Sequence, residues 1–189
     1  MKQSKAEKDN IVKRSHLALL IIFLVLCIDQ CLKIWIKTNF EYGNEVQMFG
    51  ADWARIHFIE NDGMAFGMKL GGDYGKLFLT LFRIVAVVFI AWYLISLVKH
   101  NASKSLIISI ALIFAGAIGN ILDSIFYGLL FDKGIDPISG IYGYAGIAKF
   151  SAEGYASLFH GNVVDMFYFP IAKGTYPEWM PLVKGDKYE

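Results

Sequence analysis

Residues 17–36 read LALLIIFLVLCIDQCLKIWI, an almost unbroken apolar run. A helix needs about 20 mostly apolar residues to cross the roughly 30 Å hydrocarbon core of a bilayer. The run is longer than the apolar region of a cleaved signal peptide, continues into Asp29 and Lys33, and is followed by no small-residue cleavage site. It therefore predicts a transmembrane helix that stays in the mature protein.

Two further runs of this kind follow, at residues 77–98 and 106–131. The whole chain of 189 residues is 56% hydrophobic and 19% charged, which is far more apolar than a soluble domain. No repeat or linker divides it. We expect one membrane domain over residues 1–189, an all-α polytopic membrane protein with three transmembrane helices, about 17–36, 77–98 and 106–131.

Basic residues predict the orientation, because short loops rich in Lys and Arg stay in the cytoplasm. Five of them precede the first helix, and Lys99 and Lys104 lie between the second and the third. The N-terminus is therefore expected in the cytoplasm, with residues 37–76 and everything after the third helix on the outer face. A net charge of +1 gives no case for binding nucleic acid.

The outer segments differ in character. Residues 54–59 alternate like a strand and end at the turn Glu60-Asn61-Asp62-Gly63, and residues 64–68 are able to pair back as a hairpin. We expect a small outer-face β-sheet within residues 39–76. Residues 132–189 are predicted to be an outer-face loop region, with one short helix before Gly161, because so long a segment without structure is unusual.

Charged groups inside membrane helices are costly and are functional candidates by default. Asp29 and Lys33 are four residues apart on the first helix and are expected to pair. The simplest interpretation is a structural ion pair near the outer end of the helix. Arg83 in the second helix is able to reach the outer interface with its long side chain.

The third helix carries AGAIGNILD at residues 115–123. Gly116 and Gly119, three apart, are expected to let a neighbouring helix come close. Asp123 lies about 26 Å along the helix from Leu106, near the outer boundary of the membrane, and Asn120 is one turn below it on the same face. The two side chains are therefore expected to point at one spot near the outer surface.

Asp165 stands alone in the apolar and aromatic stretch NVVDMFYF, residues 162–169. Such surroundings disfavour the ionised carboxylate and raise the pKa. A protonated acid beside an ionised one is the arrangement with which aspartic peptidases activate water. An acid at the start of a strand or helix is the alternative interpretation.

Together these motifs resemble the signal peptidase II family, the lipoprotein or prolipoprotein signal peptidases. The matching motifs, in order, are Asp29-Gln30 with Lys33, Asn61-x-Gly63-x-Ala65-Phe66, Gly119-Asn120-x-x-Asp123 and Val163-Val164-Asp165. Each is weak alone, but their order and membrane setting are specific. The residues after Asp165, MFYFP, are similar to the Bacteroidetes-like branch of the family.

The resemblance implies an aspartic endopeptidase that removes signal peptides from prolipoproteins, cleaving before the diacylglyceryl-modified cysteine, with no metal and no cofactor. It implies a monomer in the bacterial inner membrane that meets membrane lipid and works on the periplasmic face. Asp165 matches the first catalytic aspartate, and Asp29 and Lys33 a structural ion pair. The residues implied to bind substrate or support the site are Asn61, Gly63, Ala65, Phe66, Gly119, Asn120 and Asp123.

The chain departs from the family pattern in three ways. The second catalytic aspartate of the family belongs to an N-x-A-D motif that opens a fourth helix, and neither is found before Glu189. We therefore expect a fragment that stops before the last transmembrane helix and is inactive as it stands. Ser124 replaces an arginine of the family, and the stretch between Asp123 and Asp165 is longer than in most members.

Two other functions compete with the peptidase. One is a non-catalytic, lipid-binding pseudoenzyme, and the other is a subunit that relays ions or protons through Asp29, Arg83 and Asp123. A relay needs acids spread through the depth of the membrane. The acids here gather at the outer edge, which favours chemistry at the surface.

Overall fold

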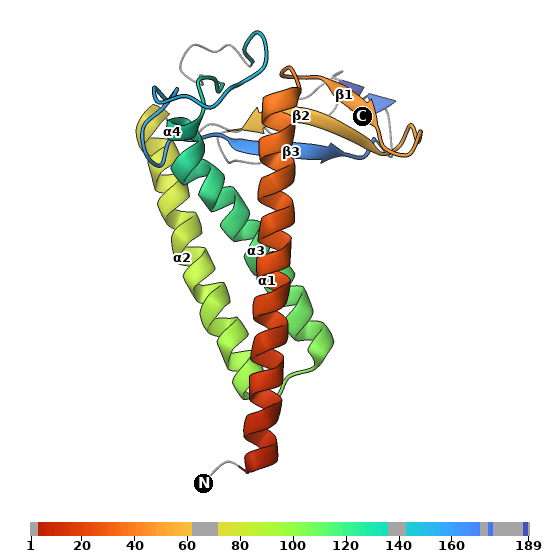
Figure 1. Ribbon diagram of the computed structural model, residues 1–189, viewed down its shortest axis with the longest axis vertical. Helices are drawn as coiled ribbons and strands as arrows, with labels where there is room; N and C mark the ends of the chain where they lie inside the picture. The colour runs from red at the N-terminus through yellow and green to blue at the C-terminus, as the bar shows by residue number, and fades with distance from the viewer. Residues whose placement is uncertain (1–3, 62–71, 136–142, 171–173, 176–186, 189) are drawn as a thin grey trace.

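The computed structural model describes residues 4–61, 72–135, 143–170, 174–175 and 187–188. Three long helices run side by side, and a small sheet with an irregular segment covers one end of them (Figure 1). We call this end the sheet end. The N-terminus lies at the opposite end.

The three predicted transmembrane helices are confirmed. They are α1 (Lys5–Asn39), α2 (Gly72–Lys99) and α3 (Lys104–Leu122), and α3 continues as the π-helical turn η2 (Asp123–Tyr127) and the short α4 (Gly128–Leu130). Within the described ranges, Lys5–Asn39, Gly75–Lys99 and Lys104–Leu130 are long and apolar enough to cross a membrane. α1 starts well before its apolar run because Ser4 caps it, accepting from the Glu7 N–H at 3.2 Å.

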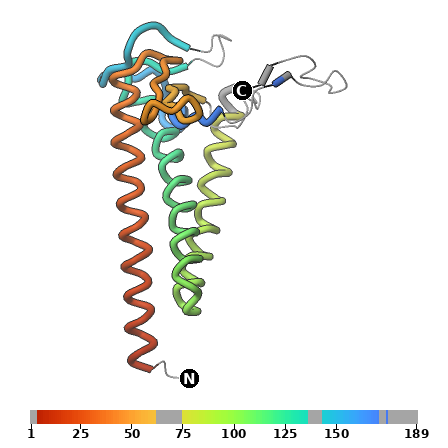
Figure 2. The backbone as a smooth tube through the Cα atoms, turned by 90° about the vertical axis from the view of Figure 1, so that its right-hand side faces the viewer, coloured from red at the N-terminus to blue at the C-terminus, as the bar shows by residue number. Residues whose placement is uncertain are grey.

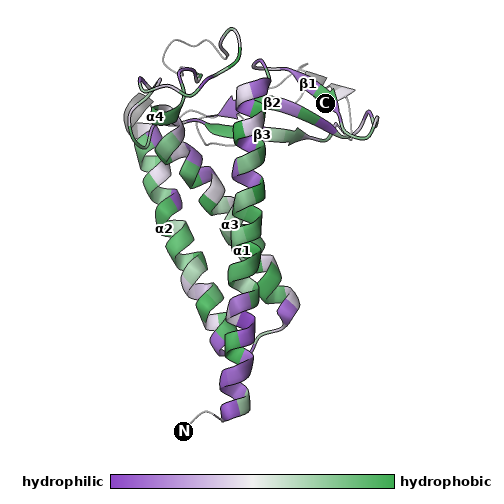
Figure 3. Cartoon of the chain, viewed as in Figure 1, coloured by the Kyte–Doolittle hydropathy of each residue, from purple (hydrophilic) through white to green (hydrophobic). Residues whose placement is uncertain are grey.

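The helices are hydrophobic along most of their length (Figure 3). Phe23 on α1 and Phe89 and Trp92 on α2 are each about two thirds exposed. A protein surrounded by water would bury such side chains, whereas lipid solvates them. The charged residues of α1 gather at its two ends, which fits a helix that passes through a bilayer.

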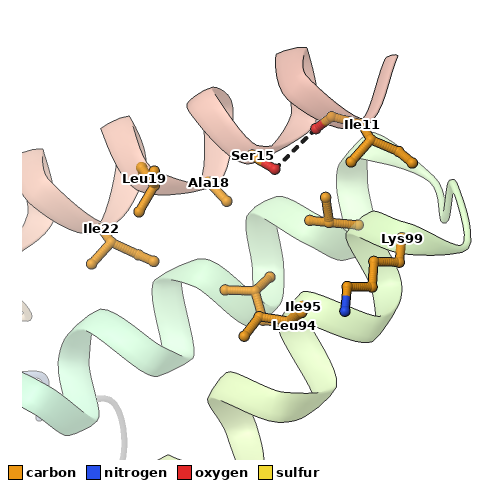
Figure 4. A pocket seen from close by; sticks show the side chains of 9 residues that line it. Ile11, Ser15, Ala18, Leu19, Ile22, Leu94, Ile95 and Lys99 are labelled. Carbon is orange, nitrogen blue, oxygen red and sulfur yellow. Dashed lines mark hydrogen bonds between the residues drawn. The ribbon is translucent and has the colours of Figure 1, made fainter. Parts of the chain in front are cut away.

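α3 lies between α1 and α2 and packs against both (Figure 2). Far from the sheet, the three helices share a small core of Ala18, Leu94, Val98, Ile107 and Ala111. A groove of about 290 Å³ opens beside it between α1 and α2, with Ile22 and Leu94 on its walls (Figure 4). Among the described residues that line it, Ser15 and Lys99 are the polar ones.

The predicted outer sheet is confirmed, but its composition differs from the prediction. β1 (Glu45–Gln47), β2 (Arg55–Asn61) and β3 (Val163–Tyr168) pair antiparallel in the order β1-β2-β3. β3 comes from the region predicted as loop, and its six residues are too short a pattern to reveal a partner more than 100 residues away. The hairpin partner proposed at residues 64–68 lies outside the described residues. β4 (Gly174–Thr175) and β5 (Lys187–Tyr188) form a separate pair.

The short helix expected before Gly161 is absent from the described residues 143–161. This part is held instead by main-chain hydrogen bonds to the end of the third helix, such as Ala156 N to Gly128 O at 3.0 Å and Gly161 N to Ser124 O at 2.9 Å. It helps to cover the core of the sheet end, which consists of Ile36, Phe58, Tyr127, Phe131, Ala148, Val164 and Met166.

Candidate active site

Asp165 lies in the middle of β3, on the face of the sheet turned away from that core. Side chains alternate along a strand, so the buried Val164 and Met166 point into the core and the partly buried Asp165 points the other way. Asp165 is opposite Ile59 of β2. Its diagonal neighbour on the same face is Asn61, whose Nδ2 donates to Oδ2 of Asp165.

The surroundings of Asp165 raise the pKa of its carboxyl group, chiefly because burial penalises the charged form. Lys33, the hydrogen bond from Asn61 and the charge of Arg83 act in the opposite direction without cancelling the effect. Asp165 therefore holds its proton at a higher pH than an exposed aspartate does. This is the property predicted from its apolar neighbours.

Lys33 binds charged and polar residues of α1, α3 and η2. Its Nζ lies 2.7 Å from Oδ2 of Asp123, 3.3 Å from Oδ2 of Asp29 and 2.8 Å from Oδ1 of Asn120. Lys33 and Asp123 are buried, whereas the Asp29 side chain is 21% exposed. Asn120 and Asp123 thus meet at one point, as their spacing predicted, and that point is the ammonium group of Lys33.

Two residues that were not predicted as site residues complete this cluster, although Gln30 belongs to the motif of the first helix. Gln30 donates through Nε2 to Oδ2 of Asp29 and to Oδ1 of Asp123, both at 3.0 Å, and accepts from Tyr127 Oη at 3.2 Å. The position of Tyr127, four residues after Asp123, was a sequence feature that could have placed it in this cluster. The π-helical turn between them made ordinary helical spacing a poor guide to its direction.

The close approach predicted for the two glycines of α3 is found at one of them. A Cβ atom on Gly119 would lie 3.1 Å from Cγ of Asp29 and closer still to its Oδ2. Gly116 is exposed, and a Cβ atom there would meet nothing within 4 Å. Gly119 therefore makes room for the ion pair, whereas Gly116 has no packing partner among the described residues.

The cluster around Lys33 also holds the strand that carries Asp165. The main-chain N–H of Val164 donates to Oδ2 of Asp123 at 3.2 Å. The same carboxylate oxygen binds Lys33. Asp123 thus links the end of the third helix, the ammonium group of Lys33 and β3.

Arg83 and Ser124 take different positions near this cluster. Arg83, with Asn120, Ala86, Val87, Ile90 and Ala117, lines a cavity of about 180 Å³ between α2 and α3. Arg83 is partly buried. Ser124 is buried and donates through Oγ to the main-chain oxygen of Asn120 at 3.0 Å.

Three predicted site residues, Gly63, Ala65 and Phe66, lie outside the described residues. Among the residues that the structure describes, no three of His, Cys, Asp and Glu come together in a group able to hold a metal ion. The described site therefore consists of one partly buried carboxyl group with a raised pKa, an amide bonded to it, and a buried ionic cluster that anchors its strand.

Comparisons with known proteins agree on one family. The family model described as Signal peptidase (SPase) II matches residues 21–182. The lipoprotein signal peptidase of Porphyromonas gingivalis is 46% identical over 169 residues, which are 89% of this chain and 70% of that protein. The lipoprotein signal peptidase of Amoebophilus asiaticus is 36% identical over 168 residues, 87% of this chain and 64% of that protein.

A solved bacterial membrane enzyme has a similar fold. Its TM-score is 0.52, with 22% identity, and the match covers 82% of this chain and 71% of that one.

Proposed function

The chain belongs to the signal peptidase II family, and on this premise we propose how its residues remove signal peptides from prolipoproteins. It is a multi-pass membrane protein and a member of a family of aspartic peptidases. The bond that it cleaves is the peptide bond before the diacylglyceryl-modified cysteine. The reaction is hydrolysis by a water molecule that carboxyl groups activate.

Asp165 is the catalytic acid of the described residues, and one observation carries this assignment. It is a carboxyl group with a raised pKa on the face of the sheet turned away from the core, and its strand β3 lies at the sheet end (Figure 1). A protonated carboxyl group there donates a hydrogen bond to the scissile carbonyl oxygen, while an ionised partner draws a proton from water. Asn61 holds the carboxyl group in place through its hydrogen bond.

The ionised partner is an acid outside the described residues. Among the described residues, Glu60 is opposite Val164 of β3 and binds Nζ of Lys37. Asp29 and Asp123 both bind Nζ of Lys33. A carboxylate engaged with an ammonium group is a poor base for water. These two acids, with Asn120 and Gly119, therefore support the site, and they do so by holding helices and strand together.

The remaining residues of the motifs complete the substrate site in this proposal. Gly63, Ala65 and Phe66 follow Asn61 in the sequence, and their role in this proposal is to bind the substrate or support the site. The acyl chains of the lipidated cysteine lie in the membrane beside the helices. The enzyme works as a monomer in the inner membrane, with the N-terminus in the cytoplasm and Asp165 on the periplasmic face.

The two competing functions are not favoured. The relatives that match are named as peptidases. A relay is also poorly supported by the positions of the acids, because Asp29 and Asp123 bind the same lysine. Such a cluster offers no series of steps across the membrane.

A cleavage assay tests the proposal. The protein made from its complete reading frame is purified in detergent and given a peptide that carries a diacylglyceryl cysteine. Mass spectrometry should identify cleavage before that cysteine.

Asp165→Asn should lower the rate by at least about 10²- to 10⁴-fold, the usual contribution of general acid-base catalysis, while the peptide still binds. Glu153→Gln, which changes an exposed acid, is the control. Cleavage by Asp165→Asn at the parent rate refutes the assignment.

A further inference from the structure

A second buried ion pair lies at the sheet end, and the mechanism above does not use it. Nζ of Lys37 at the end of α1 binds Oε1 of Glu60 near the end of β2, and both side chains are fully buried. Removing two charges from water is costly unless further hydrogen bonds satisfy them. A buried ion pair does not by itself show that it stabilises the fold. The other contacts of Lys37 and Glu60 therefore indicate what the pair does.

Those contacts satisfy both oxygens of the Glu60 carboxylate. Oε1 also accepts from Tyr144 Oη at 2.8 Å, and Oε2 accepts from the Ile135 N–H and from Nδ2 of Asn162, each at 3.3 Å. Lys37 in turn donates to the main-chain oxygen of Lys133 at 2.9 Å. Donors from four separate parts of the chain thus fix the position of one carboxylate.

Three aromatic rings enclose the ammonium group. Nζ of Lys37 lies 5.1 Å from the ring centre of Phe131, 5.4 Å from that of Tyr144 and 5.2 Å from that of Tyr155. The faces of aromatic rings attract cations, and more strongly where water is excluded. All three rings come from residues 131–155, the long segment between the third helix and β3. These three side chains therefore form the cage around Lys37.

The pair is next to the proposed catalytic residues in sequence but on the other face of the sheet. Glu60 immediately precedes Asn61 and is opposite Val164, the residue before Asp165. Asn162, just before β3, donates to Glu60 and accepts at Oδ1 from Lys76 of α2. Its main-chain N–H donates to Tyr155 Oη at 2.7 Å. The network thus holds the end of β2 at Glu60 and the start of β3 at Asn162. Both residues lie close in sequence to the contact between Asn61 and Asp165.

We propose that Lys37 and Glu60 are positioning residues for the reaction, which hold β2 and β3 in the register that brings Asn61 onto Asp165. Phe131, Tyr144 and Tyr155 serve this purpose by caging Lys37. Neither side chain touches substrate, because the sheet separates both from the face of Asp165. The inference rests on the proposed function of Asp165 and deepens it.

The test uses a double variant, Lys37→Met with Glu60→Gln. It removes one positive and one negative charge, so the net charge near Asp165 stays the same, and it avoids the unpaired buried charge of either single variant. The turnover number should fall by about 10- to 100-fold, the effect of a small misplacement of a catalytic group. KM for the lipidated peptide should stay unchanged, because no substrate contact is lost.

A second readout does not depend on cleavage. The Asn61 hydrogen bond lowers the pKa of Asp165, so a loosened register should raise that pKa further, as followed by NMR of a labelled aspartate carboxyl. Since the double variant keeps the net charge, such a shift reports position. Tyr144→Phe keeps the ring but loses the hydrogen bond to Glu60. It should raise the pKa of Asp165 and lower the turnover number, each by less than the double variant does.

The outcomes are distinct. A double or Tyr144→Phe variant with the parent turnover number and the parent pKa of Asp165 overturns the positioning role. A raised KM with unchanged turnover overturns it as well, since the cluster would then bind substrate. If the parent protein cleaves nothing but the double variant still shifts the pKa of Asp165, the positioning stands and the proposed function fails.

Discussion

The main-chain N–H of Val164 donates to Oδ2 of Asp123 across 3.2 Å, and this bond fastens β3 to the third helix one residue before Asp165. The same oxygen receives Nζ of Lys33 at 2.7 Å. The strand that carries the proposed catalytic acid is thus attached directly to an ion pair at the end of the helices. Changes to this ion pair should affect both stability and catalysis.

Asp123→Asn should lower the free energy of unfolding by about 3 kcal/mol, because among the described residues it leaves the buried ammonium group paired with the partly exposed Asp29 alone. Asp29→Asn should cost less, since Asp29 is 21% exposed and Asp123 remains. Chemical denaturation in detergent micelles measures both. An Asp29→Asn variant that is less stable than Asp123→Asn would contradict this account of the cluster.

Gly119→Ala should destabilise the protein by about 1–3 kcal/mol through overpacking against Asp29. Displacing Asp29 should also reduce cleavage. Gly116→Ala is the matched control in the same helix, where nothing lies within 4 Å of the added methyl group. It should be neutral or stabilise by up to about 1 kcal/mol, the helix preference of Ala over Gly. Equal melting temperatures for the two variants would argue against the close approach.

Asn61→Ala should slow cleavage with little loss of folded protein, because the side chain bonds Asp165 and lies outside the buried core of the sheet. Asn44→Ala, at an exposed asparagine before β1, is the control and should cleave like the parent. Rates and folded yield are compared in the same detergent. A fall in yield as large as that of a core substitution would indicate a structural role for Asn61 instead.

The raised pKa of Asp165 predicts a dependence of stability on pH. Burial favours the protonated carboxyl group, so its contribution to stability is complete below the ordinary pKa near 3.8 and is lost as the pH rises through the higher folded value. The amide of an Asp165→Asn variant does not titrate, so the variant does not lose stability in this way as the pH rises. The variant should therefore gain stability relative to the parent between acidic and neutral pH, as measured by thermal unfolding at several pH values. A relative loss over that range would mean that the folded pKa is lowered.

Reporter fusions test the orientation. A reporter that is active only outside the cytoplasm should work after Pro170 and fail at Asn101, between α2 and α3. A second reporter, active only in the cytoplasm, should give the opposite pattern. A cytoplasmic signal after Pro170 would place Asp165 on the inner face and contradict the proposed site.

The sequence predicted what depends on local periodicity. Three long apolar runs predicted three helices, and the spacing of four between Asp29 and Lys33 predicted their contact. The apolar neighbours of Asp165 predicted the direction of its pKa shift. Each of these follows from residues within a few positions of one another.

The pairing of distant segments was not predictable in this way. β2 and β3 are about 100 residues apart, and six residues of alternating pattern do not identify a partner strand. The pair of Lys37 and Glu60 depends on that pairing and on the cage from residues 131–155. A hint was present in α1, where Lys37 follows Lys33 by four residues and so lies on the same face.

That spacing of the two lysines limits how α1 can change in evolution. Each residue added to a helix turns everything beyond it by about 100°. One insertion between Lys33 and Lys37 would therefore aim the two ammonium groups in different directions, and only one of the two clusters would survive. Length changes nearer the N-terminus turn neither lysine relative to the sheet. Natural relatives with this site should vary in length before Asp29 and keep three residues between the lysines.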